Sequence, residues 1–369
     1  MTWMGKAQQI RRQNMKVNAV ASKLFSMLRE DGMRCCVLKG QGNALMYPNP
    51  YSRTPGDIDV WINASRERIM EYASKKFELG DDIRLQHLET SLDGVPVELH
   101  FFPCSMNNPI YHARLQKWFQ RNANLQCSHI VGLPDGAGDI AIPTTAFNVV
   151  YQLTHLYHHF FDEGIGMRQI IDYFLVVNDF SKNVFLNNDL SNPSVSLSKG
   201  SSTAFPKPLS PQGTGDVTAL RCSEPLRSKD GGASKPSPNC AGWDRLGGNG
   251  DTTSTALDVV QRELKYLGLW KFAGAVMYVL HETLGLSEEK MIAPMDEKRG
   301  KLLLAEILNG GNFGRHFTKY GHFTQQGMAK KYFLKIWRNM HFVRYYPAEA
   351  LSEPIFRTWH FFWRLKHRR

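Results

Sequence analysis

The chain has 369 residues, of which 42% are hydrophobic and 21% charged, which is typical of a folded globular protein long enough for two domains. It contains no apolar run of about 18 residues, and its polar, basic N-terminal segment lacks the apolar stretch of a signal peptide. We therefore expect a cytoplasmic protein without a membrane-spanning helix. The 6 cysteines form no Cys-x-x-Cys pair, which disfavours a structural zinc site.

The formal net charge is +11, an excess that attracts polyanions. Basic residues gather at Arg11-Arg12 and in the closing residues 364–369. Four interpretations stay open at this point: a solvated basic surface, an acidic substrate, RNA, or an anionic membrane surface.

Apolar spacing and turn residues predict the elements of the first part of the chain. In chain order we expect a helix over 6–30, a strand over 34–38, a short helix over 41–47, a strand over 57–62, a helix over 65–79, and strands over 83–91 and 95–102. Asp93-Gly94, between the last two strands, is typical of a tight hairpin turn.

The remainder is predicted to be helical around a long polar segment. We expect helices over 144–161 and 167–179, then helical patterning again from about 256, with helices over 297–309 and 327–340. Residues 183–255 are rich in Ser, Pro, Gly, Asn and Thr, so this segment cannot bury enough apolar area to offset chain entropy. We predict that it is disordered and dispensable for catalysis.

Three carboxylates are the most informative feature of the sequence. Asp57 and Asp59 open the apolar strand GDIDVWI, and their i, i+2 spacing puts both on one face. Glu98 lies in the later strand VPVELHF and shares a face with His100. If the two strands are neighbours, the three acids converge and favour a hard divalent cation such as Mg²⁺ between them. The alternative is a solvated strand end or an Asx turn.

Two basic residues near these acids are candidate phosphate contacts. Lys39 and Gly40 follow the strand over 34–38 at once, and a strand, a glycine turn and a helix can bring the backbone close to a phosphate. Arg53 precedes Asp57 by four residues and has the fork that binds phosphate. The alternatives are a solvated lysine and a loop arginine paired with an acid.

Several other ionisable residues are weaker candidates. His155, His158 and His159 share a predicted helix but lack the His-Glu-x-x-His arrangement, so we favour histidines at the edge of a cleft or in the core over a zinc site. Arg168 and Asp172 stand at i, i+4, which predicts a surface ion pair.

The run LKG, Tyr47-Pro48, Arg53, Asp57-x-Asp59 and the strand that carries Glu98 and His100 together resemble an uncharacterised nucleotidyltransferase family of bacteria. That family belongs to the DNA polymerase β-like nucleotidyltransferase superfamily, and the resemblance covers about residues 15–180. Two positions depart from the superfamily pattern. Lys39-Gly40 stands where Gly-Ser is usual, and Glu98 stands where Asp is common.

The resemblance implies an α+β fold, with a small mixed β-sheet core flanked by helices and followed by an all-helical domain. It implies a nucleotidyltransferase-like catalytic domain over 1–140 and the start of the helical domain over 141–182. The predicted disordered insertion over 183–255 would then precede a helical C-terminal domain over 256–369 with a basic aromatic tail. In this arrangement Asp57, Asp59 and Glu98 would be the catalytic and metal-binding residues, and Lys39, Gly40 and Arg53 would bind the nucleotide.

The resemblance implies transfer of a nucleotidyl group from an NTP, such as ATP, to a hydroxyl acceptor by a Mg²⁺-dependent two-metal mechanism. The sequence identifies neither the acceptor nor the base of the NTP. Two alternatives are a nucleotide- or polyanion-binding protein that has kept the fold and lost the chemistry, and a basic RNA-binding module.

The C-terminal stretch PIFRTWHFFWRLKHRR mixes aromatic and basic residues. We expect a last helix packed on the domain with a basic frayed tail. A helix that lies on an anionic membrane surface, or one that stacks RNA bases, is the alternative.

Overall fold

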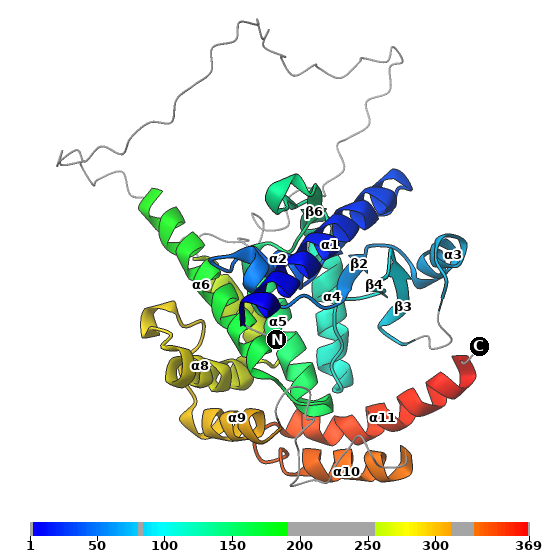
Figure 1. The fold of residues 1–369 in the computed structure, drawn as a ribbon. Helices are drawn as coiled ribbons and strands as arrows, with labels where there is room; N and C mark the ends of the chain where they lie inside the picture. The colour runs from blue at the N-terminus through cyan, green and yellow to red at the C-terminus, as the bar shows by residue number, and fades with distance from the viewer. Residues whose placement is uncertain (1–2, 80–83, 191–254, 311–327, 368–369) are drawn as a thin grey trace, which may run out of the picture. The chain divides into compact units, whose positions relative to one another are not determined.

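The computed structural model describes residues 3–79, 84–190, 255–310 and 328–367. Its main sheet has four strands in the order β1-β2-β4-β3, namely Cys35–Val37, Ile58–Ile62, Val95–His100 and His87–Leu92. Strand β2 runs antiparallel to β1 and parallel to β4, and β3 runs antiparallel to β4. The fold is therefore α+β with a small mixed sheet, which confirms the predicted fold class (Figure 1).

Alternation along β2 divides its side chains between two cores. Ile58, Val60 and Ile62 pack with the apolar stripe of helix α1 (Trp3–Glu30), which includes Leu24 and Leu28. Trp61 points to the other face of the sheet, where its ring lies 6.2 Å from that of Phe147. Asp59 shares this second face, so the strand places a carboxylate beside the helical part of the protein.

Local signals explain the element ends. Helix α3 (Arg66–Lys76) begins after Ser65, whose side chain accepts a hydrogen bond from the backbone N–H of Arg68. Between β3 and β4, Asp93 has φ 50° and Gly94 has φ 70°, the left-handed pair that a two-residue hairpin turn requires. The predicted hairpin is therefore confirmed.

Helices α4 to α11 complete the described chain. They span Pro109–Gln126, Thr145–Asp162, Met167–Leu190, Ala256–Tyr266, Trp270–Leu284, Glu297–Gly310, Met328–Met340 and Pro347–His367. Shorter elements are α2 (Gln41–Ala44), three 3₁₀ turns at Pro50–Ser52, Pro134–Gly136 and Glu288–Lys290, and a second sheet of β5 (Ile130–Gly132) and β6 (Asp139–Ala141). Among the described residues, no helix has both the length and the apolar character needed to cross a membrane.

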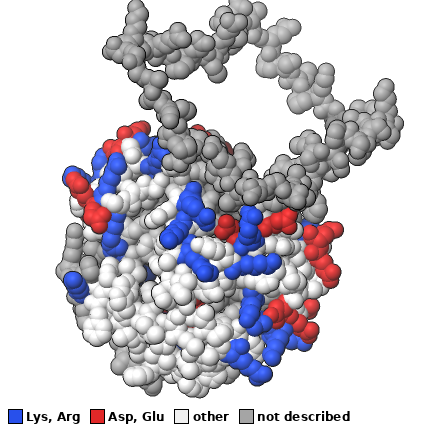
Figure 2. Space-filling model, turned by 180° about the vertical axis from the view of Figure 1, so that it is seen from behind, with Lys and Arg blue, Asp and Glu red and all other residues white. Residues whose placement is uncertain are grey.

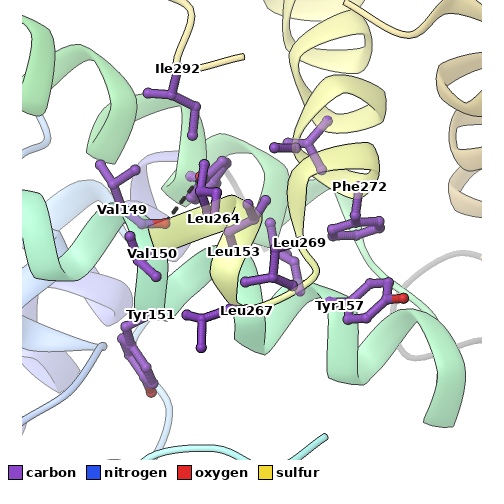
Figure 3. Packing of buried hydrophobic residues seen from close by; sticks show 14 of the residues in the cluster. Val149, Val150, Tyr151, Leu153, Tyr157, Leu264, Leu267, Leu269, Phe272 and Ile292 are labelled. Atoms are coloured by element: carbon purple, nitrogen blue, oxygen red, sulfur yellow. Dashed lines mark hydrogen bonds between the residues drawn. The ribbon is translucent and has the colours of Figure 1, made fainter. Parts of the chain in front are cut away.

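One hydrophobic cluster joins the helices on either side of the long polar segment. Leu264, Leu267 and Leu269, at the end of α7 and after it, lie against α5 together with Phe272 of α8 (Figure 3). The same cluster reaches Trp61 of the sheet. Helices from both ends of the sequence therefore share a core with the strand that carries Asp59.

Two stretches of the sequence prediction differ from the structure. Helix α6 continues to Leu190, eight residues into the range predicted as a disordered insertion, and residues 191–254 lie outside the described part of the chain. Helix α4 and the β5–β6 hairpin were not predicted. Asn108-Pro109 was the available signal for α4, because the Asn108 side chain accepts from two backbone N–H groups and Pro109 occupies the first turn.

The last helix, α11, carries exposed aromatic residues. Trp359 is 50% exposed and Phe362 is 63% exposed. The face of the molecule in Figure 2 shows basic and acidic side chains interspersed, with a broad area that carries neither. That face therefore offers no uniform basic surface, and binding of the tail to RNA or membrane stays a prediction.

Candidate functional site

All six predicted site residues line one cavity of about 300 Å³, called here the main cavity. The residues are Lys39, Gly40, Arg53, Asp57, Asp59 and Glu98. Helices α5 and α6 contribute Gln152, His155, His159 and Asp172 to the same lining. Residues of the sheet and of helices α5 and α6 therefore line the same cavity.

Strand pairing brings two of the acids together. In the parallel register of β2 and β4, Asp59 lies directly opposite Glu98. Asp59 is buried, Glu98 is partly buried, and Asp57, just before β2, is exposed. The three carboxylates that the sequence placed on one face therefore open into the same cavity, as expected if β2 and β4 are neighbours.

The charged groups of the site shift one another's pKa values. Desolvation raises the pKa of Asp57, and repulsion from Asp59 and Glu98 raises it further. Burial would also raise the pKa of Asp59, but Lys39 and His100 outweigh it and hold that pKa below its usual value. A cation bound between the carboxylates would relieve the repulsion that acts on Asp57. Carboxylate oxygens are the donors that Mg²⁺ prefers. The donor set fits a hard divalent cation.

Lys39 lines the main cavity between an acid and a histidine. Its Nζ lies 3.2 Å from Oδ1 of Asp59 and 3.0 Å from Nε2 of His155. Burial disfavours the charged amine, but the carboxylates of Asp59, Asp57 and Glu98 raise its pKa. Lys39 is therefore a charged amine held inside the cavity and not a solvated strand-end lysine.

Gly40 follows with φ 54° and ψ −107°, a conformation that residues with a Cβ rarely adopt. The turn from β1 into α2 depends on this geometry. Beyond the turn, the amide of Asn43 exchanges two hydrogen bonds with the amide of Gln152 on α5, at 3.0 and 2.6 Å. This buried amide pair, which the sequence analysis missed, fixes α2 against the helical wall of the cavity.

His100 bridges two of the acids. Its Nε2 lies 3.1 Å from Oδ1 of Asp59 and 3.2 Å from Oε2 of Glu98. Although burial opposes the charged ring, these two acceptors raise the pKa of His100. His87 lies directly opposite His100 on β3 and also lines the cavity. The i, i+2 spacing in β4 indicated His100, whereas the place of His87 follows only from the hairpin register.

Arg53 is bound by an acid of the helical part. Its Nε lies 3.0 Å from Oδ1 of Asp172 and its Nη2 lies 2.9 Å from Oδ2, in a buried fork. Tyr47 donates to the same carboxylate at 2.7 Å. The predicted surface pair between Arg168 and Asp172 is wrong, because Asp172 is buried and its oxygens bind Arg53. Arg53 is thus paired with an acid, which was the alternative to a phosphate contact. Whether Arg53 also binds phosphate stays a prediction.

His155, His158 and His159 of α5 line the main cavity. Nε2 of His155 lies 3.2 Å from Nε2 of His159. Burial lowers the pKa of both rings, to about 3 for His159, and the charge of Lys39 adds to the effect. These rings are therefore neutral near pH 7, and they edge the cavity as the sequence analysis favoured.

Comparison with known proteins identifies the family of the chain. No curated protein matches the chain. A solved structure, an antigenic nucleotidyltransferase-like protein from Paracoccidioides brasiliensis, is similar at 16% identity with a TM-score of 0.29, and the match covers 47% of this chain and 89% of that one. The model of the family described as uncharacterised nucleotidyltransferase matches residues 1–191, more than half of the sequence, and the chain belongs to this family.

Proposed function

We propose that this protein transfers a nucleotidyl group from an NTP to a hydroxyl acceptor, with the chemistry in the main cavity. The observation that carries the proposal is the convergence of Asp57, Asp59 and Glu98 beside the partly buried amine of Lys39. Family membership supports the reaction class. The acceptor and the base of the NTP are matters for experiment.

Asp57, Asp59 and Glu98 would hold Mg²⁺, which when bound neutralises the phosphates and polarises the α-phosphate. Lys39 and the backbone amide of Gly40 would steady the β- and γ-phosphates. The acceptor oxygen forms a bond to the α-phosphorus, the bond from that phosphorus to the bridging oxygen breaks, and pyrophosphate leaves. The acceptor proton passes to the carboxylate of Glu98, which the cation of His100 keeps ionised.

A second cavity of about 390 Å³ adjoins the main one and shares six lining residues with it: Arg84, Gln86, His87, His158, Asp162 and Glu163. Four cations, Arg84, Lys335, Arg357 and Arg364, line it, against the two acids Asp162 and Glu163. We infer that the acceptor enters here and carries an acidic group.

The test is calorimetric titration of the full-length protein with each of the four NTPs in the presence and absence of Mg²⁺. Wild type is expected to bind at least one NTP only with Mg²⁺, and Asp57→Asn is expected to abolish that binding. Asp57 is the sharper variant, because it is the most accessible of the three carboxylates and its substitution leaves the contacts of Asp59 with Lys39 and His100 in place. Asp93→Asn in the β3–β4 turn is the matched control, because Asn tolerates the left-handed turn.

Pyrophosphate release is then measured with a panel of phosphorylated and neutral alcohols as acceptors. This measurement distinguishes a transferase from a nucleotide-binding protein without activity. Mg²⁺-dependent binding with release establishes the transferase. Binding without release from any acceptor favours the catalytically inactive nucleotide-binding alternative. Absence of NTP binding in wild type would overturn the proposal and direct attention to RNA and anionic vesicles.

A further inference from the structure

Two histidines and one glutamate converge beside the carboxylates of the main cavity. His87 on β3 lies directly opposite His100 on β4, and Glu98 precedes His100 by two residues on the same face. Oε2 of Glu98 lies 3.2 Å from Nε2 of His100 and 3.5 Å from Nδ1 of His87. One ligand atom from each of the three residues falls within 4.8 Å of the other two.

His87 is not explained by the interactions of the described chain. Its side chain is 11% exposed, and within the described residues neither ring nitrogen has a hydrogen-bond partner. The carboxylates of Glu98 and Glu89 stand near it, at 3.5 and 3.8 Å. Buried polar atoms without a partner are uncommon, because each loses its hydration without compensation. The ring of His87 therefore faces a position that a ligand would fill.

Two of the three separations match the requirements of a metal ion, and the third, between His87 and His100, is within 4.8 Å. A tetrahedral ion with bonds of about 2.1 Å holds its ligand atoms about 3.4 Å apart. The two measured contacts to Glu98, 3.2 and 3.5 Å, bracket that value.

We propose that His87, Glu98 and His100 form a binding site for a borderline divalent metal such as Zn²⁺ or Co²⁺. Two imidazoles and one carboxylate suit this class of ion, whereas Mg²⁺ prefers oxygen ligands alone. Oδ1 of Asp59, 3.1 Å from Nε2 of His100, is a further donor beside the three residues. The site differs in chemistry from the carboxylate site of the proposed transferase, although Glu98 belongs to both.

Metal binding would replace one proton. Nε2 of His100 now shares its proton with Asp59 and Glu98, and it must lose that proton to coordinate an ion. A proton shared between two carboxylates accounts for His100 without a metal. It leaves the buried ring of His87 unexplained, so His87 is the residue that distinguishes the two descriptions.

The experiment is titration of chelator-treated, full-length protein with Co²⁺ in the absence of nucleotide, followed by visible absorption and then by displacement with Zn²⁺. Wild type is expected to bind one ion, and His87→Gln is expected to weaken binding by more than about tenfold, since loss of even an outer-shell partner costs 10–100-fold. His129→Gln, at a histidine near the β5–β6 hairpin, is the matched control. Circular dichroism of each variant checks the fold.

Two further measurements test whether the ion is bound by two histidines and whether its site is distinct from the Mg²⁺-NTP site. Proton NMR of the Co²⁺-loaded wild type should show shifted exchangeable N–H signals from two imidazoles. Asp57→Asn should retain Co²⁺ while losing the Mg²⁺-dependent NTP, which separates this site from the transferase. The proposal is overturned if wild type binds neither ion, if His87→Gln binds as tightly as wild type, or if His159→Gln on α5 loses the ion instead.

Discussion

The buried pair of Arg53 and Asp172 links the loop before β2 to helix α6 across 119 residues of sequence. Asn14 of α1 also donates to the backbone carbonyl of Arg53 at 2.8 Å. The pair therefore holds one wall of the main cavity at the point where three elements meet. Its effect on stability is measurable, because removal of one partner leaves the other charged and buried.

We expect Arg53→Ala and Asp172→Ala each to lower the free energy of unfolding by about 3–5 kcal/mol. The double variant should lose much less than the sum, because neither charge is then left alone. Urea unfolding of the four proteins gives the coupling energy. The exposed pair Glu71–Lys75 on α3 is the control, and its coupling energy is expected to be much smaller because water and salt screen exposed charges. Additive losses at Arg53 and Asp172 would contradict this description.

Gly40 supplies a second test at single residues. Its φ of 54° with ψ of −107° is strained for any residue with a Cβ, so Gly40→Ala should cost about 1–3 kcal/mol of stability. It should also weaken NTP binding, because the turn that presents Lys39 and the Gly40 amide is distorted. Gly56→Ala in the same cavity is the control, because its Cβ would meet no atom within 4 Å. Equal behaviour of the two variants in thermal unfolding would argue against a special turn.

At the scale of elements, local sequence signals predicted most of the sheet. The i, i+2 acids and the Asp93-Gly94 turn each depend on residues close in sequence, and each is found as predicted. The parallel pairing that sets Asp59 against Glu98 had to be assumed, because nothing local specifies which strands are neighbours. The partner of Asp172 could not be predicted for the same reason, since i, i+4 spacing says nothing about burial.

The start of helix α11 contains a buried acid with a testable pH dependence. Glu349 is 1% exposed and accepts hydrogen bonds from the backbone N–H groups of Asn107 and Asn108, before α4. Burial raises its pKa from 4.5 to about 7, although the two N–H groups partly offset this and Glu353 adds repulsion. Helix α11 is thus held to the rest of the chain by a carboxyl group that resists ionisation.

The sign of the effect follows from the raised pKa. Below about pH 4.5 the group is protonated in both the folded and the unfolded state, and its stabilising contribution is complete. As the pH rises through 7, the unfolded state releases the proton more readily, so this contribution is lost, up to on the order of 3 kcal/mol. Glu349→Gln should flatten the profile of unfolding free energy between pH 4.5 and 8. Glu288→Gln on an exposed turn controls for the change in net charge, and parallel profiles for wild type and Glu349→Gln would refute the assignment.

At the scale of the whole chain, the family match covers fewer residues than the hydrophobic core does. The family model ends at residue 191, yet the aromatic face of α5 is covered by later helices. The ring of Tyr157 lies 4.8 Å from that of Phe272 on α8, and the ring of Phe160 lies 4.5 Å from that of Phe342. Arg338 of α10 donates to the carbonyl of Phe160 at 2.9 Å. The later helices therefore complete the core of the helix that lines the main cavity.

A chain cut after residue 190 should consequently fail to fold cooperatively, because it exposes several large aromatic side chains, each worth about 1.5–3 kcal/mol when buried. We expect a broad thermal transition, strong binding of a hydrophobic dye and no binding of Mg²⁺-NTP. Replacement of residues 191–254 by a short Gly/Ser linker is the matched comparison and should retain both the transition and the binding, because it leaves every described helix in place. A cooperative 1–190 fragment that binds NTP like the full chain would show instead that the helices after 255 form a separable domain. The main cavity would then owe its walls to the first half of the sequence alone, and the acceptor would have to bind without Lys335, Arg357 and Arg364.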